Sequence, residues 1–122
     1  MPDTTQFPVV FQRLKGLLEP YAPALVVVTD TPETYYLNTH ALDRHRKEVF
    51  FGATQIKKTY VSYYLMPVYM FPDLLSDLSP RLRKRMQGKS CFNFTTVEDD
   101  LLAELAQLTQ RGAERFRQES LL

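Results

Sequence analysis

Two stretches rich in aromatic and β-branched side chains, Glu48–Ile56 and Thr59–Leu65, are separated only by Lys57 and Lys58. Side chains of these types favour β-strands, and a short polar link between two such runs is typical of an antiparallel hairpin. Pro67 cannot donate a backbone hydrogen bond to a sheet, so it ends the second strand. These stretches constrain the fold most, because they require a sheet with local, antiparallel pairing.

A second hairpin is predicted nearer the N-terminus. Leu25–Thr29 and Thr34–Asn38 are short and β-branched or aromatic, and the link between them contains Asp30 and Pro32. Proline presets the backbone of a turn, and aspartate can hydrogen-bond its own backbone there. The polar segment His40–Arg46 that follows is predicted to be a surface loop.

Helices are predicted at both ends of the chain. The N-terminal one has apolar side chains at helical spacing, and Pro20 and Pro23 end it. The C-terminal one has a capping box over 95–98, and Gly112 weakens or bends it by about 1 kcal/mol relative to alanine. Their apolar positions are Phe7, Val10, Phe11, Leu14, Leu17, Leu18 and Tyr21 in the first, and Leu101, Leu105, Leu108 and Phe116 in the second.

Between the hairpins and the last helix, Pro72–Leu78 is predicted to be a short helix. Ser79 and Pro80 are a strong start signal for a basic helix, which Gly88 is expected to end. Ser90–Phe94 is predicted to be the strand that completes the sheet.

Together these elements predict an α+β fold: an antiparallel sheet of about five strands with helices mainly on one face, in the order α-β-β-β-β-α-β-α. A chain of 122 residues without repeats, linkers or low-complexity tracts is expected to form a single domain over 1–122.

Composition excludes several classes of protein. The net charge of +1 provides no overall field for nucleic acid or an acidic membrane, so nucleic acid is not expected as a partner. The longest apolar run, Ala24–Val28, is too short to span a bilayer, and 1–6 lacks the pattern of a signal peptide. The single Cys91 fits a reducing compartment. We therefore expect a cytoplasmic protein without contact to a membrane.

Two segments, Tyr60-Val-Ser-Tyr-Tyr-Leu-Met-Pro-Val-Tyr69 and Leu82-Arg-Lys-Arg-Met-Gln-Gly-Lys-Ser-Cys-Phe-Asn-Phe94, resemble the DUF1801 or YdhG-like group of small bacterial domains. The resemblance extends over roughly 25–116 and is sharpest at 88–94. It implies an α+β fold and little about function, since most of that group is uncharacterised. Some relatives are linked to frataxin-like iron handling, which needs clustered exposed carboxylates. The one acidic cluster here, Glu98-Asp99-Asp100, is better explained by helix capping, so we expect no metal or cofactor.

Other motifs favour structural interpretations. Gly88-Lys89-Ser90 is not a phosphate-binding loop, because Arg83 stands where the motif needs its first glycine and a helix precedes it. His40, Asp43 and His45 make a poor zinc site, and a solvated loop is the simpler interpretation. The basic run, which could contact phosphates, is better explained as a solvated face and comprises Arg81, Arg83, Lys84, Arg85 and Lys89.

One group of residues suggests function. Strand side chains alternate between the two faces of a sheet. If Phe92 and Phe94 point toward the helices, the opposite face holds hydroxyls, an amide, a thiol and aromatic rings, which are common in ligand pockets and protein interfaces. Alternatively, the sheet is covered on both sides and the tyrosines fill a second core. The predicted ligand-binding set is Tyr60, Ser62, Tyr64, Lys89, Cys91 and Asn93.

Three functions remain open. The leading hypothesis is a non-enzymatic binding domain whose partner is a small molecule, a protein or a second copy of the chain. The second is a thiol-dependent enzyme or redox protein in which Lys89 lowers the pKa of Cys91. The third, disfavoured by the lack of an acidic cluster, is frataxin-like iron handling.

Overall fold

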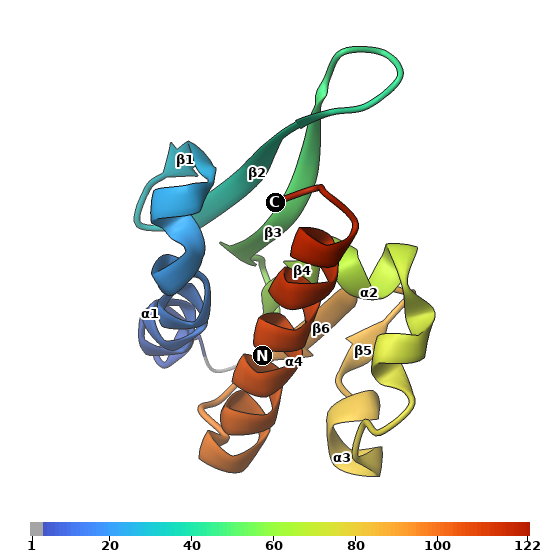
Figure 1. Ribbon diagram of the computed structural model, residues 1–122. Coiled ribbons are helices and arrows are strands. Elements are labelled where there is room, and N and C mark those ends of the chain that lie inside the picture. The colour runs from blue at the N-terminus through green and yellow to red at the C-terminus, as the bar shows by residue number, and fades with distance from the viewer. Residues whose placement is uncertain (1–3) are drawn as a thin grey trace.

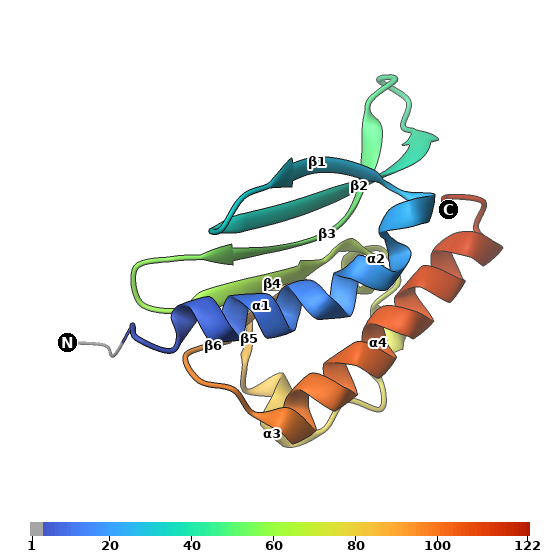
Figure 2. The same cartoon turned by 90° about the vertical axis from the view of Figure 1, so that its left-hand side faces the viewer.

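The computed structural model describes residues 4–122 and has an antiparallel sheet with its two long helices on one side (Figures 1 and 2). The sheet has the order β1-β2-β3-β4-β6-β5, so every neighbouring pair except β4–β6 is also consecutive in the chain. Its strands are β1 (Val26–Asp30), β2 (Thr34–Leu42), β3 (Glu48–Ile56), β4 (Val61–Leu65), β5 (Met86–Gln87) and β6 (Cys91–Phe94).

The long helices are α1 (Phe7–Leu18) and α4 (Asp99–Gln118). The prolines after α1 stop the regular helix as predicted, and the chain continues as the 3₁₀ segment η1 (Glu19–Ala24). The connection from β4 to β5 holds three short helices, α2 (Met66–Met70), η2 (Pro72–Leu75) and α3 (Pro80–Arg83). The predicted α+β class, with an antiparallel sheet and helices on one face, is confirmed.

The sheet has a sixth strand that the sequence did not predict. The basic helix α3 ends at Arg83 rather than at Gly88, and the chain then forms β5, which pairs with β6 through Met86 opposite Phe92. Gly88 lies in the turn between these strands with a φ of +79°, a backbone conformation that glycine adopts without strain. Gly88 is therefore a hairpin residue, and its interpretation as a helix stop was wrong.

β2 is longer than the predicted strand, and the hairpin that it forms with β3 projects from the body of the domain (Figure 1). β2 continues to Leu42, so His40 is in a strand and the loop is confined to 43–47. The Asp43 carboxylate fixes this loop by accepting the backbone N–H groups of His45 at 2.7 Å and Lys47 at 3.1 Å. Side-chain burial still alternates along this part of β2, but the buried residue is the polar Thr39 and the exposed one at the end is the apolar Leu42. The apolar alternation that marks a strand in a sequence is therefore missing there.

The predicted capping box before α4 is wrong. Glu98 is the N-cap residue and its side chain makes no capping hydrogen bond. Its carboxylate instead pairs with the Arg85 guanidinium at 2.6 Å and lies 3.6 Å from that of Arg81. A tertiary ion pair has thus replaced the local cap. Asp99 and Asp100 lie in the first turn of α4, where negative charge complements the helix dipole.

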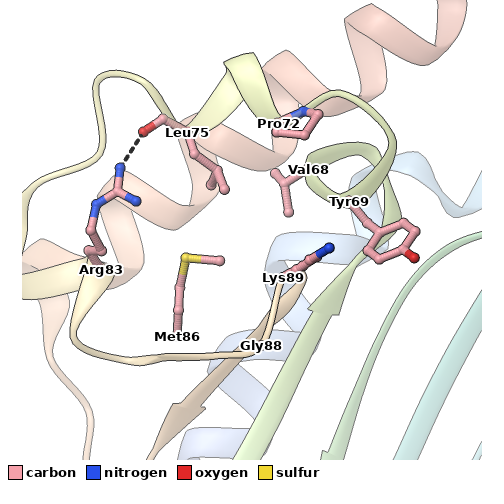
Figure 3. Close-up of a pocket in the computed structure, with 8 residues that line it drawn as sticks. All are labelled: Val68, Tyr69, Pro72, Leu75, Arg83, Met86, Gly88 and Lys89. Carbon is pink, nitrogen blue, oxygen red and sulfur yellow. Dashed lines mark hydrogen bonds between the residues drawn. The ribbon is translucent and has the colours of Figure 1, made fainter.

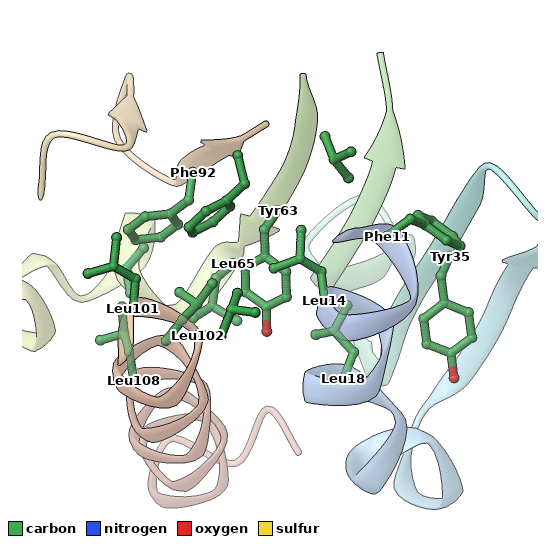
Figure 4. Packing of buried hydrophobic residues seen from close by; sticks show 14 of the residues in the cluster. Phe11, Leu14, Leu18, Tyr35, Tyr63, Leu65, Phe92, Leu101, Leu102 and Leu108 are labelled. Carbon is green, nitrogen blue, oxygen red and sulfur yellow. The ribbon is translucent and has the colours of Figure 1, made fainter. Parts of the chain in front are cut away.

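The core lies between the sheet and the two long helices (Figure 4). As predicted, one alternating set of side chains in β4 and β6 is buried there: Val61, Tyr63, Leu65, Phe92 and Phe94. The Tyr63 hydroxyl lies 2.6 Å from the Thr109 hydroxyl of α4, and Thr109 also donates to the Leu105 carbonyl at 2.8 Å. The one deep polar group on this side of β4 is therefore satisfied, and burial raises the pKa of Tyr63 far above its usual value.

Gly112 allows α4 to pack closely on α2, and replacing it with alanine is expected to destabilise the protein. A Cβ at Gly112 would lie 2.9 Å from Cβ of Pro67, well inside ordinary carbon–carbon contact. Overpacking of this kind costs about 1–3 kcal/mol, which outweighs the gain of about 1 kcal/mol in helix propensity.

Gly16 in α1 is the matched control, because a Cβ there meets nothing within 4 Å. Gly16→Ala should raise the free energy of unfolding by about 1 kcal/mol, the propensity gain alone. Urea unfolding of both variants measures the two effects. A similar stabilisation by both substitutions would contradict the packing role of Gly112.

Candidate functional site

The structure brings together four of the six residues predicted to bind a ligand. Ser62 pairs with Asn93 across β4 and β6, and Tyr64 pairs with Cys91, so these side chains share the sheet face turned away from α1 and α4. Tyr60 precedes β4, in the turn where its carbonyl accepts the Lys57 N–H at 2.8 Å. The sixth residue, Lys89, lies in the β5–β6 turn and lines a different site.

Asn93 is the centre of a hydrogen-bonded cluster on this face. Its Oδ1 accepts the Ser62 hydroxyl at 2.9 Å and the Cys91 thiol at 3.3 Å, and its Nδ2 donates to Gln87 Oε1 at 2.7 Å. Ser62 is fully buried, so this bond satisfies a polar group that would otherwise be costly to bury. The cluster joins β4, β6 and β5, and its polar groups are largely satisfied by one another.

Cys91 is a half-buried thiol held in that cluster. Burial raises its pKa, and the hydroxyls of Ser62 and Tyr64 and the positive charge of Lys57 lower it only in part. A raised pKa keeps the thiol protonated at neutral pH, whereas a nucleophile needs the thiolate. This environment gives no support to the hypothesis of a thiol activated by Lys89.

Most of the residues considered for metal binding are engaged in other contacts. Arg44 Nε donates to His45 Nε2 at 3.2 Å, and the Asp43 carboxylate is bonded to the loop backbone. Asp99 pairs with Arg13 at 2.6 Å, and Asp100 pairs with Arg81. Within residues 4–122, no group of three or more His, Cys, Asp or Glu side chains is arranged to hold a metal ion.

A cleft of about 570 Å³ lies beside α2, η2 and the β5–β6 hairpin (Figure 3). The side chains of Val68, Leu75 and Met86 point into it from three different elements. Tyr69 and Lys89 stand side by side at one end and Arg83 at the other. The eight lining residues are Val68, Tyr69, Pro72, Leu75, Arg83, Met86, Gly88 and Lys89.

The cleft combines an apolar interior with uncompensated positive charge. None of its lining residues is acidic. Arg83 donates to the Leu75 carbonyl at 2.8 Å, a bond that orients the guanidinium without neutralising it. In the described part of the chain neither Arg83 nor Lys89 forms an ion pair, whereas Arg81 and Arg85 of the same basic run are paired with carboxylates.

Sequence reasoning identified Lys89 and the basic run but missed the cleft itself. Its walls come from segments up to some twenty positions apart, and they meet only because Gly88 turns the chain from β5 into β6. The exposed Tyr69, 53% accessible directly after the buried Val68, is the one local signal that an aromatic group borders a surface site.

Comparison with known proteins gives no family assignment: no protein-family model, no curated protein and no solved structure matches the chain. Over residues 4–122, no helix combines the length and the apolar character needed to cross a membrane. The function is therefore inferred from the site.

Proposed function

We propose that this domain is a non-enzymatic binding module whose ligand is a small amphipathic anion held in the cleft at Lys89. The observation that carries the proposal is the combination of an apolar interior with two cations that form no ion pair within residues 4–122. A hydrocarbon or ring body would contact Val68, Leu75 and Met86, and its anionic group would lie against Lys89 or Arg83.

Size and chemistry support this class of ligand. A volume of about 570 Å³ falls within the usual range for small-molecule sites, which are mostly apolar with a few placed polar groups. Arginine presents a planar fork suited to carboxylate or phosphate, and lysine adds a mobile point charge. The resemblance to DUF1801 or YdhG-like domains belongs to this proposal as well. The iron handling linked to some of those domains would need clustered carboxylates, which the lining of the cleft lacks.

Octanoate is a suitable probe, because it has one carboxylate on a flexible apolar chain. We expect it to shift the backbone amide signals of Val68, Tyr69, Met86 and Lys89 in a nuclear magnetic resonance titration. Lys89→Glu replaces the attraction between the Lys89 ammonium and the octanoate carboxylate with a repulsion between two carboxylates. It should weaken octanoate binding about tenfold or more.

Lys84→Glu is the matched control, since Lys84 is an exposed lysine of the same basic run that does not line the cleft. It makes the same change in net charge and should leave octanoate affinity nearly unchanged. Equal weakening by both variants would reduce the effect to net charge. Unchanged amide signals at millimolar octanoate would refute the cleft as an anion site.

A further inference from the structure

The sheet face opposite the helices is free of formal charge across its middle. α1 and α4 both cover the other face (Figures 1 and 2). The strand register places two rows on the uncovered face, Tyr36–Ala53–Tyr64–Cys91 and Ser62–Asn93. Neither row holds a carboxylate, ammonium or guanidinium group, so a partner can pack against both rows without burying a formal charge.

The composition of this face matches the centre of a protein interface, where charge is depleted and tyrosine and phenylalanine are enriched. Phe50 stacks on Tyr36 with ring centroids 4.7 Å apart, and Tyr64 is half-buried. The polar groups among them are bonded within the Asn93 cluster, so covering this face leaves few hydrogen bonds unsatisfied.

Charges of opposite sign stand at the two ends of β3 on this same face. Glu48 lies at the start of the strand and accepts a hydrogen bond at 3.4 Å from Asn38, the partner of Phe50. Lys57 follows the end of the strand and continues the alternation of Ala53 and Gln55. Both side chains are exposed.

We infer that this face is the interface of a symmetric dimer between two copies of the chain, packed sheet to sheet with their β3 strands running in opposite directions. A two-fold axis across the strands brings Lys57 of each copy to Glu48 of the other, whereas an axis along the strands would place Lys57 beside its own image. Two-fold interfaces are self-complementary, and this pattern of charge suits only the first arrangement. The dimer does not depend on the cleft, which lies beyond β4 and β6.

Charge reversal at the two rim positions tests this arrangement. The wild type is expected to sediment as a dimer at high micromolar concentration. K57E and E48K should each weaken dimerisation about tenfold or more, because each creates two like-charged contacts per dimer. Lys58→Glu is the control, because Lys58 is also exposed but lies one residue outside the alternation that places Lys57 on this face. It should leave the dimer affinity of the wild type unchanged.

An equimolar mixture of K57E and E48K should form a heterodimer, since each charge again meets its opposite. The double variant K57E/E48K should also recover self-association. These surface changes should leave the thermal unfolding of the monomer unaltered, so loss of the dimer is separable from loss of the fold. A wild type that stays monomeric at millimolar concentration, or a mixture that fails to associate, overturns the inference.

Discussion

Phe116→Ala is expected to lower the free energy of unfolding by about 3–5 kcal/mol, the usual cost of removing a fully buried aromatic ring. Phe116 of α4 has no exposed surface. Its ring packs edge-on against Phe51 of β3 at 5.9 Å and against Phe71 at 6.2 Å between centroids. The substitution therefore leaves a cavity where the sheet, α4 and the segment after α2 meet.

The same substitution should also weaken binding in the cleft. Phe71 joins α2 to η2, and the Arg115 guanidinium lies 4.4 Å above its ring while pairing with Asp73 of η2 at 2.9 Å. Loss of the Phe116 ring removes the support beneath this segment, which carries the Val68 and Leu75 wall.

Val9→Ala, on an exposed side chain of α1, is the control for the stability measurement and should change the free energy of unfolding by less than about 0.5 kcal/mol. A comparable loss in the control would contradict the core role.

Glu104→Ala is expected to cost about 2 kcal/mol, since hydrogen bonds to a charged group are the stronger kind and one of the donors is a backbone amide. The Glu104 carboxylate of α4 accepts the Ser79 N–H at 2.8 Å and the Ser79 hydroxyl at 2.6 Å. Ser79 in turn caps α3 by accepting the Leu82 N–H at 3.2 Å. One carboxylate therefore holds the start of the helix that presents Arg83.

Glu114→Ala is the appropriate control for that experiment. Glu114 is on the same helix and pairs at the surface with Arg117, three positions further on. Exposed pairs of this kind contribute about 0.3–0.5 kcal/mol. Chemical denaturation should thus separate the two variants by more than 1 kcal/mol, as an order of magnitude. Equal effects would show that the Ser79 contacts contribute nothing beyond a surface charge.

The parts of the fold that could be predicted are those whose signal is local. Alternation in 61–65 and 91–94 placed Tyr63 and Phe92 in the core correctly, because the two faces of a strand differ by one residue step. β5 escaped prediction because a two-residue strand has no period to detect. Its pairing depends on the Gly88 turn, which the sequence presents equally well as a helix end.

The other features that were not predicted share a different cause. Glu98 has the right spacing for a capping box, yet its carboxylate pairs with Arg85, which lies thirteen positions earlier in the chain. From the sequence, Gly112 is predicted only to weaken its helix. Its role in packing becomes evident from its close approach to Pro67 in the fold. The cleft, likewise, forms only where α2, η2, α3 and the β5–β6 turn come together in the fold. Each depends on tertiary contacts that no local pattern encodes.

The central claim is that the cleft selects an anion with an apolar body, and charge preference tests it most directly. Octanoate and octylammonium have the same chain length and opposite charge, so titrating the wild-type protein with each isolates the role of Arg83 and Lys89. We predict that octanoate shifts the amide signals of Val68, Met86 and Lys89 and that octylammonium leaves them unchanged at equal concentration. Equal binding of the two probes, or a preference for octylammonium, would contradict the proposed function.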